Sequence, residues 1–598
     1  MKNFKEKADL IWRVADLLRG DYKQSDYGKV ILPLTVIRRL DSILEPTKQK
    51  VLDILPKYSS LKDAALELAL NKIAGFNFHN KSQFNFDKLI ADPNNIALNL
   101  RNYINGFSSS AREIIEYFNF DDQITRMDDP KADLLFRVIK SFQEIDLKDM
   151  DSMEMGYIFE DLIRRFSEQS NETAGEHFTP REVIRLMVNL LFMEDTAILT
   201  QDGIVKTLYD PACGTGGMLS IGEQYVKELN PKAELKVFGQ EINPESYAIC
   251  KSDMLIKGQN PSNVKFGNTF TVDGLEQEKF DYMLSNPPFG VDWKKAEKTI
   301  KEEADKRGMS GRFGAGLPRI NDGSLLFLQH MISKMKGDGS RIAIVFNGSP
   351  LFTGSAGSGE SEIRKWIIEN DWLEAIVALP DQLFYNTGIS TYIWVVSNKK
   401  SNSRKGKVQL INATGIKDED LVKEGKLEFN RFWQKMDRSL GNKRKKIAEN
   451  GNEKGIGFIS ELYGNFQENE FCKIVPNDFF AYWRITVEQP LVENEKIVMV
   501  KGKPKPDSAL RDYENIPFLR KDEHGKLVPQ TIEEYFDAEV KPHLPDAWID
   551  HSKTKIGYEI NFTKYFYEFK PLRSLADIKA DILALETKSF EAEKGILG

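Results

Sequence analysis

Apolar residues near the start of the chain recur with the repeat of an α-helix. The first stripe consists of Leu10, Ile11, Val14, Leu17 and Leu18. Gly20 follows this stripe at the position of a helix C-cap, which glycine favours. Because the helical character continues, residues 1–150 are predicted to form an N-terminal helical domain. Its apolar residues are assigned to packing, since no set of catalytic residue types stands out among them.

From about residue 151 to residue 415, short apolar runs alternate with helical ones. The strand-like runs lie at 204–209, 235–239, 280–285, 340–346, 373–379 and 391–397. This alternation is typical of an α/β domain with a mainly parallel sheet. In such a sheet, ligands bind beyond the carboxyl ends of the strands, so the residues that follow each run are the candidates for chemistry.

A glycine-rich turn follows the first of these strands and precedes a helical pattern at 218–229. It reads Asp210-Pro211-Ala212-Cys213-Gly214-Thr215-Gly216-Gly217. Strand, glycine turn and helix open a nucleotide-type site, in which the backbone approaches the ligand without a Cβ clash. The Lys and Ser or Thr that close a P-loop do not follow, which disfavours a nucleoside triphosphate. Glu241 ends the next strand, where an acidic residue grips ribose hydroxyls; for Asp210, a helix-capping or turn role is the alternative.

The tetrapeptide Asn286-Pro287-Pro288-Phe289 follows another buried run. The prolines end the strand there and place the Asn side chain at its carboxyl end. An amide oxygen and a proline carbonyl both accept hydrogen bonds, so they can converge on one NH2 group. Phe289 offers a flat face to a planar ring, although core packing is the usual role of a Phe. The tetrapeptide therefore predicts a site that presents a planar amine to an electrophile.

In this order, the glycine turn, Glu241 and the tetrapeptide resemble the motifs of an S-adenosylmethionine-dependent amino-methyltransferase. The preceding Gly175-Glu176-His177-Phe178-Thr179-Pro180-Arg181 is similar to the segment that folds over the methionine part of the cofactor in N6-adenine DNA methyltransferases. The motif order matches the gamma arrangement of those enzymes. Residues 379–389 and parts of the first 41 residues resemble the modification subunit of type I restriction-modification systems. The likeness covers most of residues 1–415.

This resemblance implies a class I S-adenosylmethionine-dependent methyltransferase fold, Rossmann-like with a mainly parallel sheet that an antiparallel strand closes. It also implies methyl transfer to N6 of a flipped-out adenine in double-stranded DNA, with Asn286, Pro287, Pro288 and Phe289 as catalytic residues. The implied cofactor-binding residues are Glu176, His177, Phe178, Thr179, Pro180, Arg181, Asp210, Cys213, Gly214, Thr215, Gly216, Gly217, Glu241 and Asn268. The implied partners are DNA, a specificity subunit that reads the target site and a restriction subunit, with two copies of this chain per complex.

Three positions depart from the family pattern. His177 stands where an aromatic ring is common, Phe289 replaces a Tyr but keeps the stacking face, and Asn268 occupies the position of an acidic residue. Thr179 and Pro180 also fit the start of a helix, with Glu182 three residues after the Thr. Both interpretations of this dipeptide are compatible.

The composition describes a globular protein of several domains, with 598 residues, 41% hydrophobic and 29% charged. No apolar run is long enough to span a membrane, and the first residues lead into an amphipathic pattern. The three cysteines form no disulfide or metal-binding framework. A cytoplasmic protein is therefore expected. The net charge of −7 indicates that a partner supplies many of the contacts to DNA. The basic clusters at 399–407 and 443–446 are assigned mostly to solvated loops, with a minority contacting phosphates.

The remaining segments give weaker signals. The glycine-rich residues 308–323 are either a mobile insertion or a loop that orders around DNA. Residues 416–570 form a poorly defined extension with a linker near 501–506. At 571–598, Ser574 and Asp577 resemble the start of a helix whose short apolar seam packs on the chain itself or, as the family implies, docks on the specificity subunit.

Two other functions fit the same residues. Asn-Pro-Pro-aromatic motifs also serve enzymes that methylate RNA base amines or protein glutamine. A non-catalytic subunit that binds the cofactor and places a partner on DNA is the non-enzyme alternative. The intact Asn286 and Glu241 disfavour the latter, and the helical N-terminal region with residues 379–389 favours DNA modification.

Overall fold

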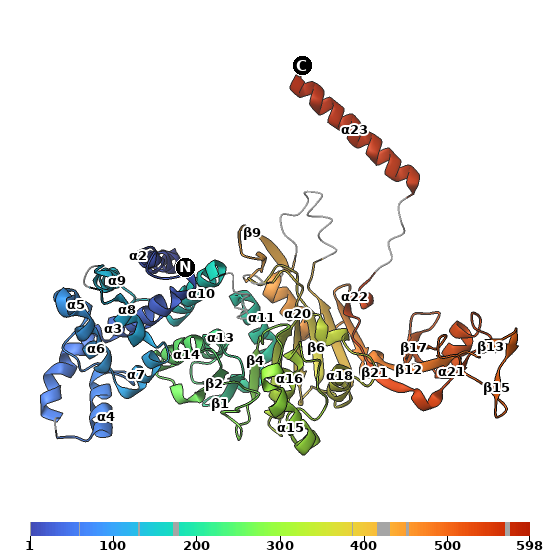
Figure 1. Cartoon of the computed structure of the whole chain (residues 1–598), viewed down its shortest axis with the longest axis horizontal. Helices are drawn as coiled ribbons and strands as arrows, with labels where there is room; N and C mark the ends of the chain where they lie inside the picture. Colours follow the sequence, from blue (N-terminus) through green and yellow to red (C-terminus); the bar gives the residue numbers. More distant parts are fainter. Residues whose placement is uncertain are drawn as a thin grey trace. The chain divides into compact units, whose positions relative to one another are not determined.

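A computed structural model describes two units of the chain (Figure 1). The larger spans Met1–Ile560 and the smaller Asn561–Gly598. The described residues are 2–58, 60–129, 132–170, 179–385, 387–415, 431–449, 454–567 and 574–597. Within these ranges, no helix combines the length and the apolarity that a membrane crossing requires.

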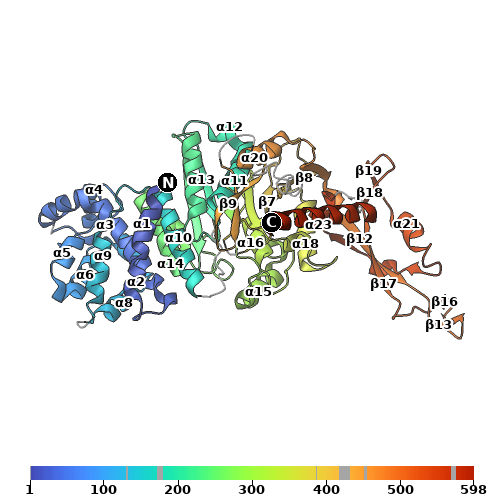
Figure 2. The ribbon, with the colours of Figure 1, turned by 90° about the horizontal axis from the view of Figure 1, so that it is seen from above.

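The first part of the larger unit is helical, and its helices gather beside the sheet (Figure 2). They are α1 (Lys2–Trp12), α2 (Val14–Leu18), α3 (Gly28–Ile54), α4 (Asp63–Ala74), α5 (Phe86–Ile90), α6 (Ile96–Asn105), α7 (Ser109–Glu116), α8 (Phe120–Met127), α9 (Leu134–Gln143) and α10 (Ser152–Ser170). The predicted apolar stripe lies in α1 and α2, and Gly20 follows with a positive φ of 99°. Their hydrophobic core also includes Ala248, Ile249 and Leu255 of α14 (Pro244–Ile256), so the helical region and the sheet region share a core.

The centre of the unit is a nine-stranded sheet in the order β11-β8-β6-β7-β5-β4-β1-β2-β3. The strands are β1 (Val205–Asp210), β2 (Glu234–Glu241), β3 (Val264–Phe266), β4 (Tyr282–Ser285), β5 (Arg341–Phe346), β6 (Leu373–Ala378), β7 (Tyr392–Ser397), β8 (Lys407–Asn412) and β11 (Cys472–Pro476). β7 runs antiparallel between β5 and β6, and β11 runs antiparallel to β8. The other pairings are parallel. The predicted parallel sheet and its antiparallel closing strand are both present.

Helices cover both faces of this sheet. The face that includes Leu208 packs against α11 (Arg181–Phe192), α13 (Gly217–Leu229), α14 and α20 (Gly455–Asn465). Tyr209 points to the opposite face, where its hydroxyl lies 3.0 Å from His330 Nε2 of α16 (Ser324–Ser333). α16 contacts α18 (Gly359–Glu369) on that side. The other α-helices between residues 181 and 369 are α12 (Thr196–Leu199), α15 (Glu297–Arg307) and α17 (Ser349–Phe352).

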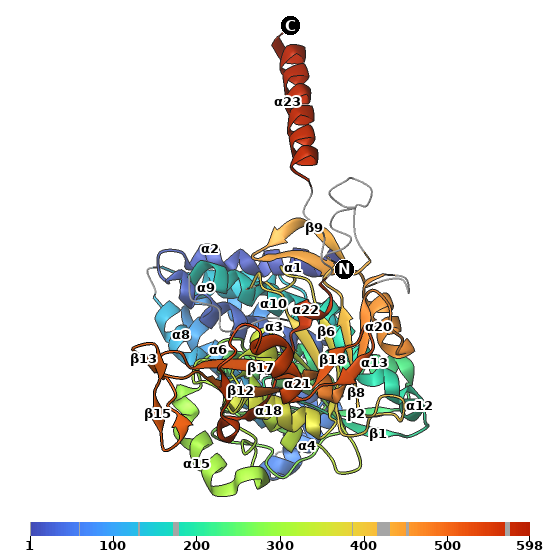
Figure 3. The same cartoon turned by 90° about the vertical axis from the view of Figure 1, so that its right-hand side faces the viewer.

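Beyond the sheet, two further parts of the larger unit were not foreseen as structured. A hairpin of β9 (Trp433–Leu440) and β10 (Lys443–Ile447) stands out from the body (Figure 3). A second, smaller sheet joins β12 (Ala481–Glu488), β17 (Asp512–Pro517), β20 (Trp548–Ile549) and β21 (Lys555–Tyr558). It carries α21 (Ile532–Tyr535) and the hairpins β13 (Val492–Glu493) with β14 (Lys496–Ile497), β15 (Met499–Val500) with β16 (Lys503–Pro504), and β18 (Leu519–Lys521) with β19 (Leu527–Pro529). The expected linker at 501–506 therefore contains a turn and a strand.

The smaller unit contains α22 (Phe562–Tyr565) and α23 (Leu575–Leu597). Ser574 caps α23, because its Oγ accepts a hydrogen bond from the Asp577 amide at 3.1 Å. The seam predicted at Leu575, Ile578, Ile582 and Leu585 is exposed, with Leu575 at 86%.

Candidate active site

The strands β4, β1 and β2 are neighbours, and the loops that follow them meet at one edge of the sheet. A cavity of about 450 Å³ lies there. The sequence-predicted residues that line it are Thr179, Asp210, Cys213, Gly214, Thr215, Gly217, Glu241, Asn268, Asn286 and Pro288. Those that lie near it without lining it are Pro180, Arg181, Gly216, Pro287 and Phe289. Glu176, His177 and Phe178 lie outside the described residues.

Asp210 ends β1 and is almost completely buried. Its Oδ1 accepts hydrogen bonds from the Ala212 amide and from the Ser285 hydroxyl, both at 3.0 Å. Burial raises the pKa of Asp210 to about 7, and the neighbouring Glu241 adds to this rise, while the two hydrogen bonds oppose it. Asp210 therefore stabilises the turn, as the alternative interpretation of this residue predicted, and it also places an acidic group at the cavity.

Glu241 ends β2 and connects two loops of the cavity. Its Oε2 accepts a hydrogen bond from the Gly214 amide at 2.8 Å. Its Oε1 accepts from the amides of Ile242 and Asn243, at 2.9 and 2.8 Å. Burial raises the pKa of Glu241, and these three amides oppose the rise. The carboxyl group is therefore held in a fixed orientation at the cavity wall.

The glycine turn is shaped by close packing under it. Gly216 has a φ of 84°, and a Cβ there would lie 2.8 Å from Cys250 Sγ. Gly214 has a φ of 53°, and a Cβ there would meet no protein atom within 4 Å. Gly216 is therefore required by both its conformation and its neighbour, whereas Gly214 keeps open space beside the cavity.

The opposite wall of the cavity is aromatic and comes largely from the segment after the tetrapeptide. Phe270, Trp293 and Phe327 line the cavity, and Trp293 belongs to a core with Phe270 and Phe313. Arg312 holds this wall in place, because its guanidinium donates to the carbonyl oxygens of Thr269 and Phe270 at 2.8 and 3.0 Å. The glycine-rich residues 308–323 therefore pack as part of the site. The sequence did not predict this packing, because isolated aromatic residues give no periodic pattern.

Asn286 follows β4 and is held by a residue from a distant part of the chain. Its Nδ2 donates a hydrogen bond to Thr179 Oγ1 at 2.8 Å. Thr179 lies two residues before α11, whose N-cap is Pro180. The structure thus confirms a helix start near this dipeptide and also brings Thr179 to the tetrapeptide. The ring of Phe289 packs edge-on against Phe384, with the centroids 6.2 Å apart.

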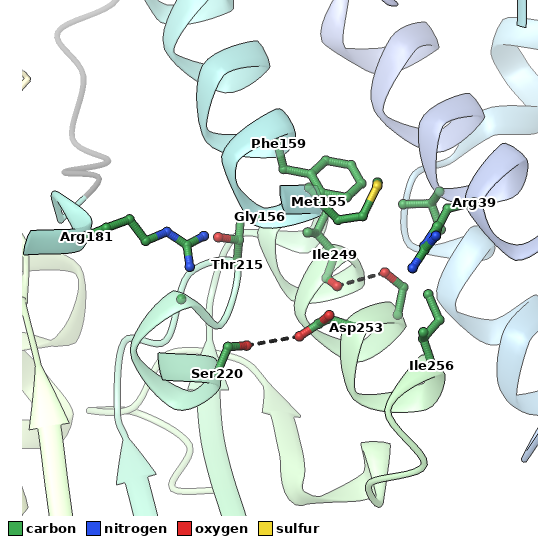
Figure 4. A pocket seen from close by; sticks show the side chains of 13 residues that line it. Arg39, Met155, Gly156, Phe159, Arg181, Thr215, Ser220, Ile249, Asp253 and Ile256 are labelled. Carbon is green, nitrogen blue, oxygen red and sulfur yellow. Dashed lines mark hydrogen bonds between the residues drawn. The ribbon is translucent and has the colours of Figure 1, made fainter. Parts of the chain in front are cut away.

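Arg181 does not line the larger cavity, although its ion-pair partner Glu160 does. Its Nη2 lies 2.7 Å from Glu160 Oε1 of α10, and both side chains are largely buried. Figure 4 shows Arg181 directed toward Gly156 and Thr215, in a small second cavity. A Cβ at Gly156 would lie 2.1 Å from the Arg181 Nη2, so glycine is required for this approach. Arg181 therefore fixes α10 against the glycine turn.

Family comparisons agree with this arrangement. The N-6 DNA methylase family matches residues 150–475, more than half of the chain, and the HsdM N-terminal domain matches residues 8–142. A methyltransferase subunit of a type I restriction-modification system from Streptococcus thermophilus aligns with a TM-score of 0.60 and 22% identity, over 80% of this chain and 96% of that one. This likeness shows the shared fold, and the predicted class I S-adenosylmethionine-dependent methyltransferase fold is confirmed. The chain belongs to the N-6 DNA methylase family.

Similar curated proteins are methylase subunits of type I restriction enzymes. The MjaIX methylase subunit of Methanocaldococcus jannaschii is 31% identical over 262 residues, which cover 44% of each chain. The HindI methylase subunit of Haemophilus influenzae is 30% identical over 265 residues, which cover 44% of this chain and 54% of that one. The chain spans about half the length of the curated relatives it matches.

Proposed function

We propose that this chain transfers a methyl group from S-adenosylmethionine to N6 of a flipped-out adenine in double-stranded DNA. The observation that carries the proposal is the convergence of Asp210, Glu241 and Asn286 on one cavity. Membership of the N-6 DNA methylase family supports the same reaction. The proposed role in the cell is that of the modification subunit of a cytoplasmic type I restriction-modification complex.

The cavity suits the proposed cofactor. Its volume of about 450 Å³ lies in the usual range for cofactor sites, and its walls combine aromatic rings with acidic side chains, among them Asp210 and Glu241. Glu241 is assigned to the ribose hydroxyls, and Asp210 with the turn 213–217 to the methionine part. When bound, S-adenosylmethionine supplies an electrophilic methyl group, and the protein supplies orientation and polarisation.

Asn286 and Pro287 are assigned to the target amine. The lone pair of the adenine amino group is delocalised into the ring, which makes the nitrogen a poor nucleophile. Asn286 Oδ1 and the Pro287 carbonyl oxygen accept hydrogen bonds from its two hydrogens. These acceptors favour a tetrahedral nitrogen and stabilise the positive charge that develops on it. No strongly basic residue is required for the transfer step.

The target nitrogen cannot be reached inside a duplex, so the proposed reaction requires base flipping. Phe289 is assigned to stack on the extruded adenine, a contact that contributes about 1–3 kcal/mol per base. Its edge-on contact with Phe384 holds one side of the ring in the protein.

The proposed partners follow from the family resemblance and from the type I methylase subunits to which the chain is similar. We propose that a separate specificity subunit reads the DNA target, that two copies of this chain join it, and that restriction subunits complete the complex. The exposed apolar residues of α23, with Ile578 and Ile582 at 41% and 51%, suit docking on the specificity subunit.

The test of this function is methyl transfer from labelled S-adenosylmethionine to unmodified genomic DNA, with and without the co-encoded specificity subunit. Nucleoside analysis should find N6-methyladenine, and only when the specificity subunit is present. Cofactor binding without DNA labelling in either case would instead point to an RNA or protein substrate, or to a non-catalytic subunit.

Replacement of Glu241 by alanine should weaken cofactor binding about 10- to 100-fold. The change removes a charged hydrogen-bond acceptor, worth roughly 1.5–3 kcal/mol, and releases the Gly214 amide. Isothermal titration calorimetry with S-adenosylmethionine measures the effect. Glu234→Ala, at the exposed start of the same strand, serves as the control and should bind normally. Equal affinities for the two variants would remove Glu241 from the site.

Thr179 is proposed to orient the Asn286 amide rather than to take part in chemistry. Thr179→Val deletes the hydroxyl that accepts from Asn286 Nδ2. A lost hydrogen bond of about 1 kcal/mol corresponds to a roughly five- to tenfold fall in kcat, with little change in the KM for the cofactor. Thr179→Ser keeps the hydroxyl and should retain most of the activity. A change confined to the KM of the cofactor would contradict this role.

A further inference from the structure

The two basic clusters of the sequence have different environments in the structure. In the cluster at 399–407, Lys399 Nζ lies 2.6 Å from Asp195 Oδ2 and Lys400 Nζ lies 2.6 Å from Asp371 Oδ1. The Arg404 guanidinium is buried, 3.0 Å from a carboxylate oxygen of Glu194. These three charges are paired with carboxylates of the fold, which leaves Lys405 and Lys407 as the exposed cations of this cluster.

The second cluster lies on the β9–β10 hairpin, and Arg444 and Lys446 of it are exposed. Strand alternation places Arg444 and Lys446 on the face of β10 opposite Lys443 and Lys445. The exposed cations of the hairpin are Lys435, Arg438, Arg444 and Lys446. Within the described parts of the chain, none of these four side chains takes part in an ion pair. Residues 433–449 contain six basic and two acidic residues, in a chain whose net charge is −7.

The turn end of the hairpin, from Asn442 to Lys445, is fixed to the segment 381–385. Lys445 Nζ lies 2.7 Å from Asp381 Oδ1, and the Asn442 amide donates to the Tyr385 carbonyl at 2.9 Å. The ammonium of the buried Lys443 donates to the Leu383 carbonyl at 2.9 Å. These contacts hold the hairpin in a defined position rather than leaving it as a solvated loop.

Two short series of contacts connect this turn end with the tetrapeptide. On one side, Phe384 of the same segment packs against Phe289. On the other, Lys443 also pairs with Glu182, in the first turn of α11. That turn directly follows Thr179, which holds Asn286. The turn end of the hairpin therefore lies beside the part of the site that is assigned to the target base.

We propose that the exposed cations of the β9–β10 hairpin bind the sugar–phosphate backbone of DNA next to the flipped-out adenine. This inference rests on the proposed function and adds the contact surface for its substrate. A local cationic patch on an acidic protein attracts a polyanion, and the guanidinium groups of Arg438 and Arg444 suit phosphate oxygens. Backbone contacts of this kind position the duplex without reading its sequence.

The test compares two fourfold variants of the full-length chain with equal charge changes. The hairpin variant carries Lys435→Gln, Arg438→Gln, Arg444→Gln and Lys446→Gln. The control variant carries Lys496→Gln, Lys501→Gln, Lys503→Gln and Lys505→Gln, all exposed on the remote hairpins β13–β14 and β15–β16. Fluorescence anisotropy with a 30-base-pair duplex measures affinity from low to moderate salt, and calorimetry measures the binding of S-adenosylmethionine.

The hairpin variant should lose at least about tenfold in DNA affinity, and its salt dependence should flatten by about 3 in the slope of log K against log salt. The control variant should behave as wild type, and all three proteins should bind S-adenosylmethionine alike. Equal losses in both variants, no loss in either, or no duplex binding by the wild-type chain would overturn the proposal. Retained duplex affinity with lost binding of the specificity subunit would also overturn it, in favour of a protein partner.

The same proteins separate this inference from the proposed function. Wild-type chain that binds the duplex through the hairpin, but transfers no methyl group to DNA with the specificity subunit present, would refute the proposed function alone. Methyl transfer that is unaffected by the hairpin changes, at limiting DNA concentration, would refute the hairpin contact alone.

Discussion

Asn286→Ala is expected to reduce methyl transfer to DNA about 100- to 1000-fold, the usual loss when one group that stabilises developing charge is removed. The variant loses the Oδ1 acceptor assigned to the adenine amine, while Pro287 keeps its carbonyl. Because Asp210 and Glu241 are unchanged, the affinity for S-adenosylmethionine should stay within about twofold of wild type. Single-turnover transfer with the specificity subunit present measures the first effect, and calorimetry the second.

Two variants control this experiment. Asn286→Asp keeps an oxygen acceptor and should retain more activity than the alanine variant. Asn370→Ala replaces an exposed Asn whose side chain bonds only locally, to the Trp366 carbonyl, and should be fully active. Undiminished methylation by Asn286→Ala would refute the proposed mechanism, because no other side chain has been assigned to the target amine.

Glu374→Ala is expected to lower the free energy of unfolding by about 3–5 kcal/mol, because it leaves a buried guanidinium without its counter-ion. Arg341 Nη2 lies 2.7 Å from Glu374 Oε1, and both side chains are essentially inaccessible to water. The Tyr463 hydroxyl of α20 also donates to Glu374, and Arg341 Nε donates to the Leu191 carbonyl of α11 at 3.1 Å. The group therefore ties β5 and β6 to two covering helices.

Thermal unfolding of the variant measures this effect as a lowered midpoint. Asp202→Ala, which breaks the exposed Lys232–Asp202 pair, is the control and should change the midpoint little. Arg341→Met with Glu374→Leu removes both charges and should recover part of the loss. A midpoint for Glu374→Ala equal to that of the control would contradict the assigned role.

The pH dependence of stability follows from the same pair. Burial alone raises the pKa of Glu374, but Arg341 outweighs it and holds the pKa below its ordinary value. A lowered pKa in the folded state adds stability above the ordinary glutamate pKa, and this stability is lost as the pH falls.

The sequence located the parts of the site that depend on local rules. Asp210 and Glu241 each end a strand, Asn286 directly follows another strand of the same sheet, and the edge at which these parallel strands end is common to all three. Their meeting at one cavity was therefore predictable from three short motifs. The antiparallel β7 was predictable as well, because its apolar run and the turn before it can both be recognised from consecutive residues in the sequence.

Long-range contacts escaped sequence reasoning. Trp293 lines the cavity only because the segment around Arg312 packs back on Phe270, and no spacing in the sequence records that contact. Arg181 lies in the motif assigned to the cofactor, yet it lines the small second cavity and pairs with a carboxylate of α10, a contact that no spacing in the sequence records. The strand β11 extends the sheet through pairings with β8 between residues more than sixty positions apart.

The core shared by α14 and the N-terminal helices determines how this protein can be shortened. α14 follows β2, the strand that ends in Glu241, yet its Ala248, Ile249 and Leu255 are buried in the core of the N-terminal helices α1 to α10. Lys251 on the same helix lies 2.9 Å from Glu113 of α7. A chain truncated to its family-matched part, residues 150–475, would expose the apolar face of α14, the helix that follows Glu241. The helical region therefore acts as a scaffold for the sheet, and we expect its removal to lower solubility.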